Sequence, residues 1–159
     1  MRYGRVAGSI GLAGLLLAVL GAAPVQAGCQ PTWGLRFGTP QIVSASAGLL
    51  IGKIDAPEPP PPGTFLPRGL LLQIEPGLGG GKLSAGYASG LLPYAGYGIK
   101  LSALRTWGHP WVAKPRASYL GIEADASFFV KFSVGVMRRV GGDPASSGTM
   151  LTGGIGLAF

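Results

Sequence analysis

Apolar and small residues alternate along the final stretch of the chain. In residues 149–159, Leu151, Ile155, Leu157 and Phe159 fall on one face of an extended strand, and mostly small residues fall on the other. Successive side chains of a strand point to opposite sides, so this pattern predicts a β-strand with one apolar face.

The same two-residue period recurs upstream, interrupted by Gly, Pro and Asp. No segment sustains the apolar spacing of three and four that marks an amphipathic helix. Eight antiparallel strands are therefore predicted, although the first is short and without it the count falls to seven. Their ranges are 33–37, 43–52, 70–78, 82–87, 94–107, 119–126, 128–137 and 149–159, with a turn expected at 126–127.

Charged residues within these strands fall on the less apolar face. Only 12% of all residues are charged, which is few for covering the exterior of a soluble protein. An inverted barrel, with lipid outside and side chains filling a polar interior, accounts for both observations. Unpaired buried charges are costly. Three acidic and three basic residues are therefore expected to pair inside: Glu75, Lys82, Lys100, Glu123, Asp125 and Lys131.

The N-terminus has the pattern of a secretory signal. Arg2 and Arg5 precede an uncharged apolar run at 10–23, and small residues follow it. We expect residues 1–27 to be a cleaved signal peptide and residues 28–159 to form one barrel domain. The apolar run is shorter than the about 20 residues that a membrane-spanning helix needs.

Cys29 is the only cysteine and lies just after the expected cleavage site. The sequence Ala27-Gly28-Cys29 resembles the end of a bacterial lipoprotein signal, in which the cysteine is lipidated. The usual Leu three residues before the cysteine is replaced by Gln26, so only half of the pattern is present. Two alternatives are therefore open for Cys29: lipidation, or an unmodified residue near the mature N-terminus.

The strand 149–159 resembles the C-terminal signal strand of bacterial outer-membrane β-barrel proteins, which typically ends in Phe. With the export signal and the alternation, the chain resembles the small, eight-stranded class over roughly residues 33–159. The resemblance implies an all-β, antiparallel up-and-down transmembrane barrel in the cell outer membrane of a Gram-negative bacterium. It also implies contact with membrane lipid and lipopolysaccharide, and a monomeric state. Recognition by the barrel-assembly machinery is expected through Leu151, Ile155, Leu157 and Phe159.

An even strand count places both termini on the periplasmic side. The connections at 108–116 and 141–148 are then expected outside the cell. The proline-rich segment 55–63 falls on the periplasmic side, where long connections are unusual.

Candidate chemistry is sparse. His109 is the only histidine, and its possible partners Ser102, Ser118 and Asp125 have no spacing that brings them together. One His and one Cys cannot build a structural metal site, and we expect no cofactor. Eight strands also leave no continuous aqueous pore.

Basic charge does not point to nucleic acid. Removal of residues 1–27 would lower the formal net charge from +7 to +5, and no basic run is longer than Arg138-Arg139. Dispersed charge of this kind lacks the one-sided clustering that nucleic-acid binding needs. We expect a non-enzymatic structural or envelope-interaction role. Two alternatives fit the same residues: a periplasmic ligand-binding β-protein or lipoprotein anchored through Cys29, and a lipid-modifying outer-membrane enzyme.

Overall fold

In the computed structural model, residues 28–55, 66–92, 95–142 and 144–158 are described, and their regular secondary structure is entirely β-strand. The residues expected to form the signal peptide, most of the proline-rich segment and Phe159 lie outside these ranges. The strands are β1 (Cys29–Thr39), β2 (Ile42–Asp55), β3 (Leu66–Pro76), β4 (Gly80–Leu92), β5 (Ala95–Thr106), β6 (Ser118–Phe128), β7 (Val130–Gly141) and β8 (Thr149–Ala158).

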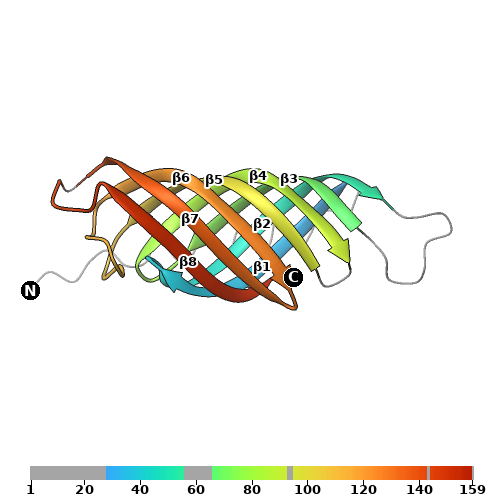
Figure 1. Cartoon of the computed structure of the whole chain (residues 1–159), viewed down its shortest axis with the longest axis horizontal. Helices are drawn as coiled ribbons and strands as arrows, with labels where there is room; N and C mark the ends of the chain where they lie inside the picture. The colour runs from blue at the N-terminus through green and yellow to red at the C-terminus, as the bar shows by residue number, and fades with distance from the viewer. Residues whose placement is uncertain (1–27, 56–65, 93–94, 143, 159) are drawn as a thin grey trace, which may run out of the picture.

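Each strand pairs antiparallel with its neighbours in the sequence, and β1 also pairs with β8, which closes the sheet into a barrel (Figure 1). The closing seam runs from Gly34 opposite Ala158 to Thr39 opposite Gly153. The predicted all-β, antiparallel up-and-down barrel of eight strands is confirmed. The short segment 33–37 is part of β1, so the count of eight holds.

The turn between β6 and β7 differs from the prediction. It was expected at 126–127, but Ser127 and Phe128 still pair with Lys131 and Val130, and only Phe129 separates the two strands. Phe129 has a positive φ of 59°, which lets the chain reverse within a single residue. The apolar alternation continues through this turn, which is why the sequence pattern placed it too early.

The connections of the barrel divide into two groups. We call the end with the connections β1–β2, β3–β4, β5–β6 and β7–β8 the loop end, and the opposite end the turn end (Figure 1). At the loop end, the amide of Trp111 donates to the carbonyl of Pro40 at 3.0 Å, and that of Gly79 donates to Gln41 at 3.0 Å. The amide of Trp107 donates to Gly79 at 3.2 Å. These bonds join three connections into one assembly.

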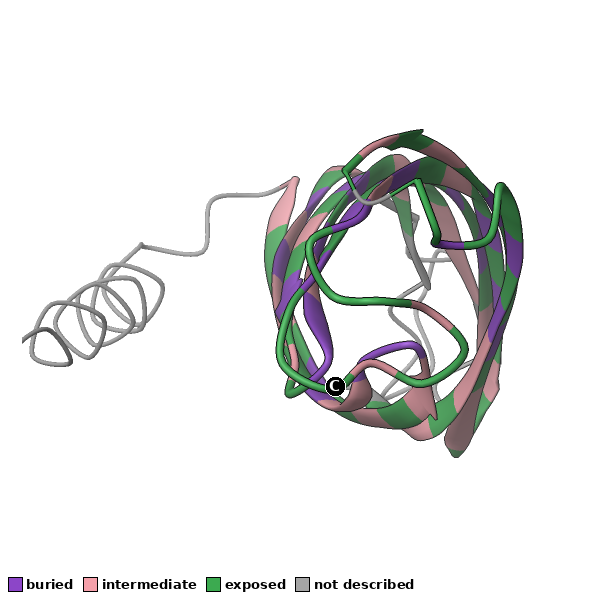
Figure 2. Ribbon diagram, turned by 90° about the vertical axis from the view of Figure 1, so that its left-hand side faces the viewer, coloured by how far each residue is buried: buried purple, intermediate pink, exposed green. Residues whose placement is uncertain are grey.

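Side-chain polarity is inverted relative to a soluble protein. Among the described residues, buried side chains include thirteen polar or charged residues against seven hydrophobic ones. The large apolar residues of the strands are instead exposed around the outside, as with Leu101 at 63% and Val134 at 62%. Buried and exposed positions alternate along the ribbon in Figure 2. The core of this protein is therefore its polar interior.

Candidate functional site

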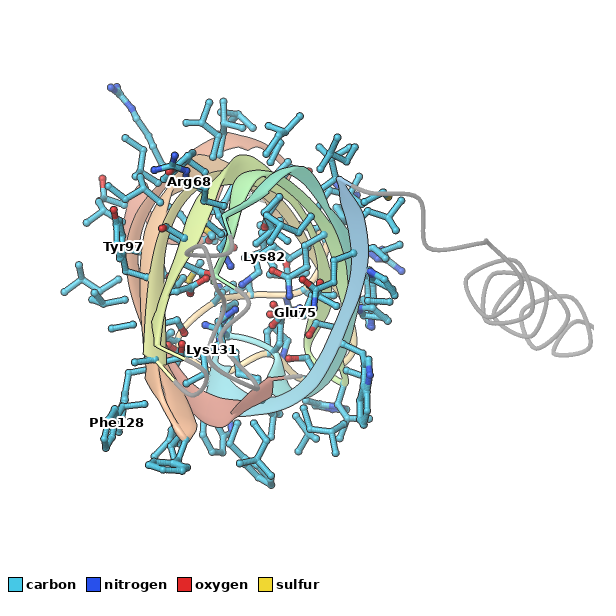
Figure 3. The ribbon with its side chains drawn as sticks, turned by 90° about the vertical axis from the view of Figure 1, so that its right-hand side faces the viewer. Arg68, Glu75, Lys82, Tyr97, Phe128 and Lys131 are labelled. Carbon is cyan, nitrogen blue, oxygen red and sulfur yellow. The ribbon has the colours of Figure 1, made fainter. Side chains whose placement is uncertain are left out.

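Seven charged side chains lie inside the barrel and form one network in the described part of the chain. Figure 3 shows Glu75, Lys82 and Lys131 within the ring of strands, whereas Tyr97 and Phe128 point away from it. The members come from six strands: Arg36, Glu75, Lys82, Lys100, Glu123, Asp125 and Lys131. We call this set the interior ion network.

Acidic and basic groups alternate through the interior ion network. Lys82 Nζ lies 3.0 Å from Glu75 Oε2 and 2.8 Å from Glu123 Oε2. Lys100 Nζ lies 3.0 Å from Glu123 Oε1 and 2.7 Å from Asp125 Oδ2. Lys131 Nζ extends the network with a 3.1 Å contact to Asp125 Oδ2. Glu123 and Asp125 therefore each face two lysines, which offsets the cost of removing these carboxylates from water.

Arg36 is the member that sequence reasoning missed. Its Nη1 lies 3.3 Å from Glu75 Oε1 and 3.3 Å from Glu123 Oε2. The six residues predicted for the interior are balanced in charge, and Arg36 gives the network four cations against three carboxylates. The available signal was its place between Leu35 and Phe37, both exposed on the other face of β1. The shortness of the predicted strand 33–37 hid this alternation.

Neutral side chains complete the interior ion network. Ser44 Oγ donates to Glu75 Oε1 at 2.7 Å, and Lys100 Nζ donates to Gln73 Oε1 at 3.1 Å. Gln41 Nε2 donates to the backbone carbonyl of Glu75 at 2.7 Å. Ser44 and Gln73 thus use hydrogen-bonding capacity that the ion pairs leave over on Glu75 and Lys100, whereas Asp125 Oδ1 is buried without a hydrogen-bond partner.

An apolar cluster lies between the interior ion network and the loop end. It consists of Leu104, Ala117, Tyr119, Met137 and Met150, all almost completely buried. Thr106 holds the following loop against it, because its Oγ1 donates to the carbonyl of Lys114 at 2.7 Å and accepts from the amide of Ala117 at 3.0 Å. The interior near the loop end is thus filled by packed side chains.

The inward glycines serve close strand packing. A Cβ built on Gly86 would overlap the carbonyl oxygen of Ile99 on the neighbouring strand, and one on Gly156 would overlap that of Leu35. Adjacent backbones already occupy the space that a side chain would need. At these two positions, glycine permits the strands to approach and leaves no room for a ligand.

Of the residues predicted for assembly and lipidation, Phe159 lies outside the described ranges, and the others lie on the outside of the barrel or at its turn end. Leu151, Ile155 and Leu157 are exposed on the outer face of β8, which pairs with β7 and β1. Cys29 begins β1 at the turn end, opposite Ile51, and its side chain is partly buried. Its position is two steps of the alternation from Trp33, so both occupy the outer face.

The residues considered for catalysis are not brought together. His109 is exposed in the loop between β5 and β6, whereas Ser102 is buried in the interior and hydrogen-bonded to Ser84 at 2.8 Å. Asp125 is held by two lysines of the interior ion network. Ser118 Oγ accepts a hydrogen bond from Arg105 at 2.7 Å. Each candidate partner of His109 is thus engaged elsewhere.

Within residues 28–55, 66–92, 95–142 and 144–158, no group of three or more His, Cys, Asp or Glu side chains is arranged to hold a metal ion. The same ranges contain no helix long and apolar enough to cross a membrane.

The closed sheet, the buried ion network and the exposed apolar residues define a structural class: an up-and-down β-barrel with an ionic interior and an apolar exterior. Comparison of the chain with models of protein families, with curated proteins and with solved structures found no match.

Proposed function

We propose that this protein is an integral outer-membrane β-barrel protein of a Gram-negative bacterium. Its role is structural or in envelope interaction, through the loop end, and involves no catalysis. The observation that carries the proposal is the inverted polarity, in which exposed leucines, valines and isoleucines surround a buried ion network. Exposed apolar surface of this extent would drive aggregation in water and is favourable against lipid.

Strand length supports the same conclusion. The strands have 10 to 14 residues, and a tilted strand needs about 9–11 to cross the hydrocarbon layer. A closed barrel also satisfies the backbone amides and carbonyls within the protein, which a lipid environment demands. The barrel therefore meets the two backbone requirements for crossing a bilayer.

The topology gives an orientation to the proposal. β1 begins and β8 ends at the turn end, which is the periplasmic side in single-chain bacterial barrels. The loop end then faces the cell exterior, and membrane lipid and lipopolysaccharide surround the apolar face. Leu151, Ile155 and Leu157 are available on the outer face of β8 to the barrel-assembly machinery. We take the functional form to be a monomer, since the sheet closes on itself without a second chain.

Fractionation of cells that express the full chain tests the proposal. We expect the protein in the outer-membrane fraction, resistant to extraction with carbonate or urea. A folded barrel should also migrate differently in gels before and after boiling, because closed barrels resist unfolding in cold detergent. Recovery from the soluble periplasm with no mobility shift would overturn the proposal.

A further inference from the structure

The outer surface of the barrel carries a groove of about 510 Å³ across β2 to β6. This volume is within the range of small-molecule sites. Three outward alanines account for the groove, because each is flanked across the sheet by larger residues. Ala47 lies opposite Trp33 and Ile74. Ala85 lies opposite Leu72 and Leu101, and Ala103 lies opposite Leu83 and Leu120. The groove is therefore apolar, with alanines at its floor and larger apolar side chains at its sides.

The groove lies in the half of the barrel nearest the loop end. Leu83 is close to the start of β4 at Gly80, and Ala103 is close to the end of β5 at Thr106. Leu120 is close to the start of β6 at Ser118. In the orientation proposed above, this half of the barrel faces the outer leaflet of the membrane.

Arg105 lies at the side of the groove that faces the loop end. Arg105 occupies the next outward position after Ala103 on β5, and its Nη1 donates to Ser118 Oγ at 2.7 Å. Ser118 is in turn two residues before Leu120, which lines the groove. Of the five N–H donors of a guanidinium, this bond uses one and leaves others for an anion.

Two further arginines lie beside this position. Arg138 of β7 is exposed and lies directly opposite Leu120. Arg116 is exposed in the loop, and its amide donates to the carbonyl of Thr106 at 2.9 Å, which brings it to the end of β5. The acidic side chains that the structure describes, Glu75, Glu123 and Asp125, are all buried inside the barrel. The described surface at this end is therefore cationic.

Trp107 lies beside Arg105 at the same end. Its indole covers Gly81, which pairs with Arg105, and its Nε1 donates to the carbonyl of Gly77 at 3.1 Å. Tryptophan rings favour the boundary between hydrocarbon and headgroups. In the proposed orientation, the Arg105 guanidinium is thus at headgroup level, and the apolar groove lies next to it on the side facing the hydrocarbon layer.

We propose that the groove and its arginines form a binding site for lipopolysaccharide. One acyl chain lies in the groove, and a phosphate of the lipid A headgroup lies on Arg105, with Arg116 and Arg138 beside it. Guanidinium groups bind phosphate in a bidentate manner. Because β5 and β7 are two strand spacings apart, roughly 10 Å, Arg105 and Arg138 suit a headgroup with two separate phosphates. This inference rests on the proposed membrane location and orientation.

The test uses the full chain, purified in detergent micelles and titrated with lipopolysaccharide or with phosphatidylglycerol, with bound lipid measured by native mass spectrometry. We expect preferential binding of lipopolysaccharide. Arg105→Gln should weaken it about 10-fold, as expected for loss of a charged hydrogen-bonded contact. Ala103→Leu keeps every charge but fills the groove, and should weaken binding to a similar extent.

Two matched variants serve as controls. Arg68→Gln removes an exposed cation at the turn end, and Ala124→Leu enlarges an outward alanine of β6 outside the groove. Neither should change the affinity for lipopolysaccharide. Equal binding of the two lipids, or equal affinity in all four variants, would overturn the inference. The membrane location would still stand if the protein fractionates with the outer membrane, so the two failures are distinguishable.

Discussion

Arg36 and Glu123 are 87 positions apart in the chain, yet Arg36 Nη1 lies 3.3 Å from Glu123 Oε2 across the interior of the barrel. Their strands, β1 and β6, are not hydrogen-bonded neighbours, so no backbone ladder holds the two residues together. The side chains themselves therefore brace opposite walls of the barrel. Glu123 is the centre of this bracing, because Lys82 and Lys100 also contact its carboxylate.

Glu123→Gln should destabilise the barrel more than Arg36→Met. Glu123→Gln leaves four interior cations, of which Lys82 and Lys100 are buried, with two carboxylates, and removal of one partner of a buried ion pair costs about 3–5 kcal/mol. Arg36→Met leaves three cations and three carboxylates, so we expect a loss nearer 1 kcal/mol, the contribution of a typical hydrogen bond. Guanidinium-induced unfolding in detergent micelles measures both. Equal losses of stability for the two variants would show that removing the excess cation costs as much as removing a carboxylate, and would contradict this explanation.

The faces of the strands could be predicted from the sequence because alternation is a local property. A residue's side of the sheet follows from its odd or even place in the strand, so the sequence alone assigns Glu75, Lys82 and Lys100 to one face, and all three are buried in the barrel. Neighbouring pairs such as Glu75 with Lys82 and Lys100 with Glu123 are also directly opposite in the ladders. The alternation and the order of the strands are therefore enough to predict the face of each residue and its directly opposite neighbours.

Contacts across the interior could not be predicted in the same way. They depend on how the closed sheet is tilted and staggered, which no short segment specifies. The contact of Arg36 with Glu123 and the packing of Tyr119 in the apolar cluster show this limit. Tyr119 lies next to the start of β6, where membrane barrels commonly carry girdle aromatics, yet its ring is buried within the apolar cluster. Its parity with Glu123 on β6 indicated the inward direction.

Leu101→Arg tests whether lipid covers the outside of the barrel. Leu101 is in the middle of β5 and exposed, and arginine at the centre of a bilayer costs a membrane barrel about 2–4 kcal/mol. The matched control is Leu78→Arg, because Leu78 is equally apolar and exposed but lies in the β3–β4 connection at the loop end. We expect Leu101→Arg to fold poorly into lipid vesicles and Leu78→Arg to fold normally. A soluble barrel would accept both substitutions alike.

Gly86→Ala tests the role of the inward glycines. The new methyl group would overlap the carbonyl of Ile99 and force β4 and β5 apart. Overpacking of this kind costs about 1–3 kcal/mol, so the midpoint of denaturant unfolding should fall. Gly141→Ala is the control, because nothing lies within 4 Å of a Cβ at that position. Comparable stability of the two variants would contradict the close-approach explanation.

Deletion of Phe159 should impair assembly in the cell more than it lowers the stability of the folded barrel. Phe159 follows β8, whose outward residues Leu157 and Ile155 continue the apolar face that resembles an assembly signal. The matched control is Phe132→Ala, which removes an exposed outward aromatic ring from β7 without touching the chain end. We expect the deletion to reduce the amount of barrel in the outer membrane while its refolding in micelles stays close to that of the intact chain. Phe132→Ala should leave membrane levels nearly unchanged, because in the proposed membrane location the many other exposed apolar side chains of the outer face would still contact lipid. Normal membrane levels after the deletion would mean that assembly does not depend on the terminal ring, and the signal would then have to lie in Leu151, Ile155 and Leu157 alone.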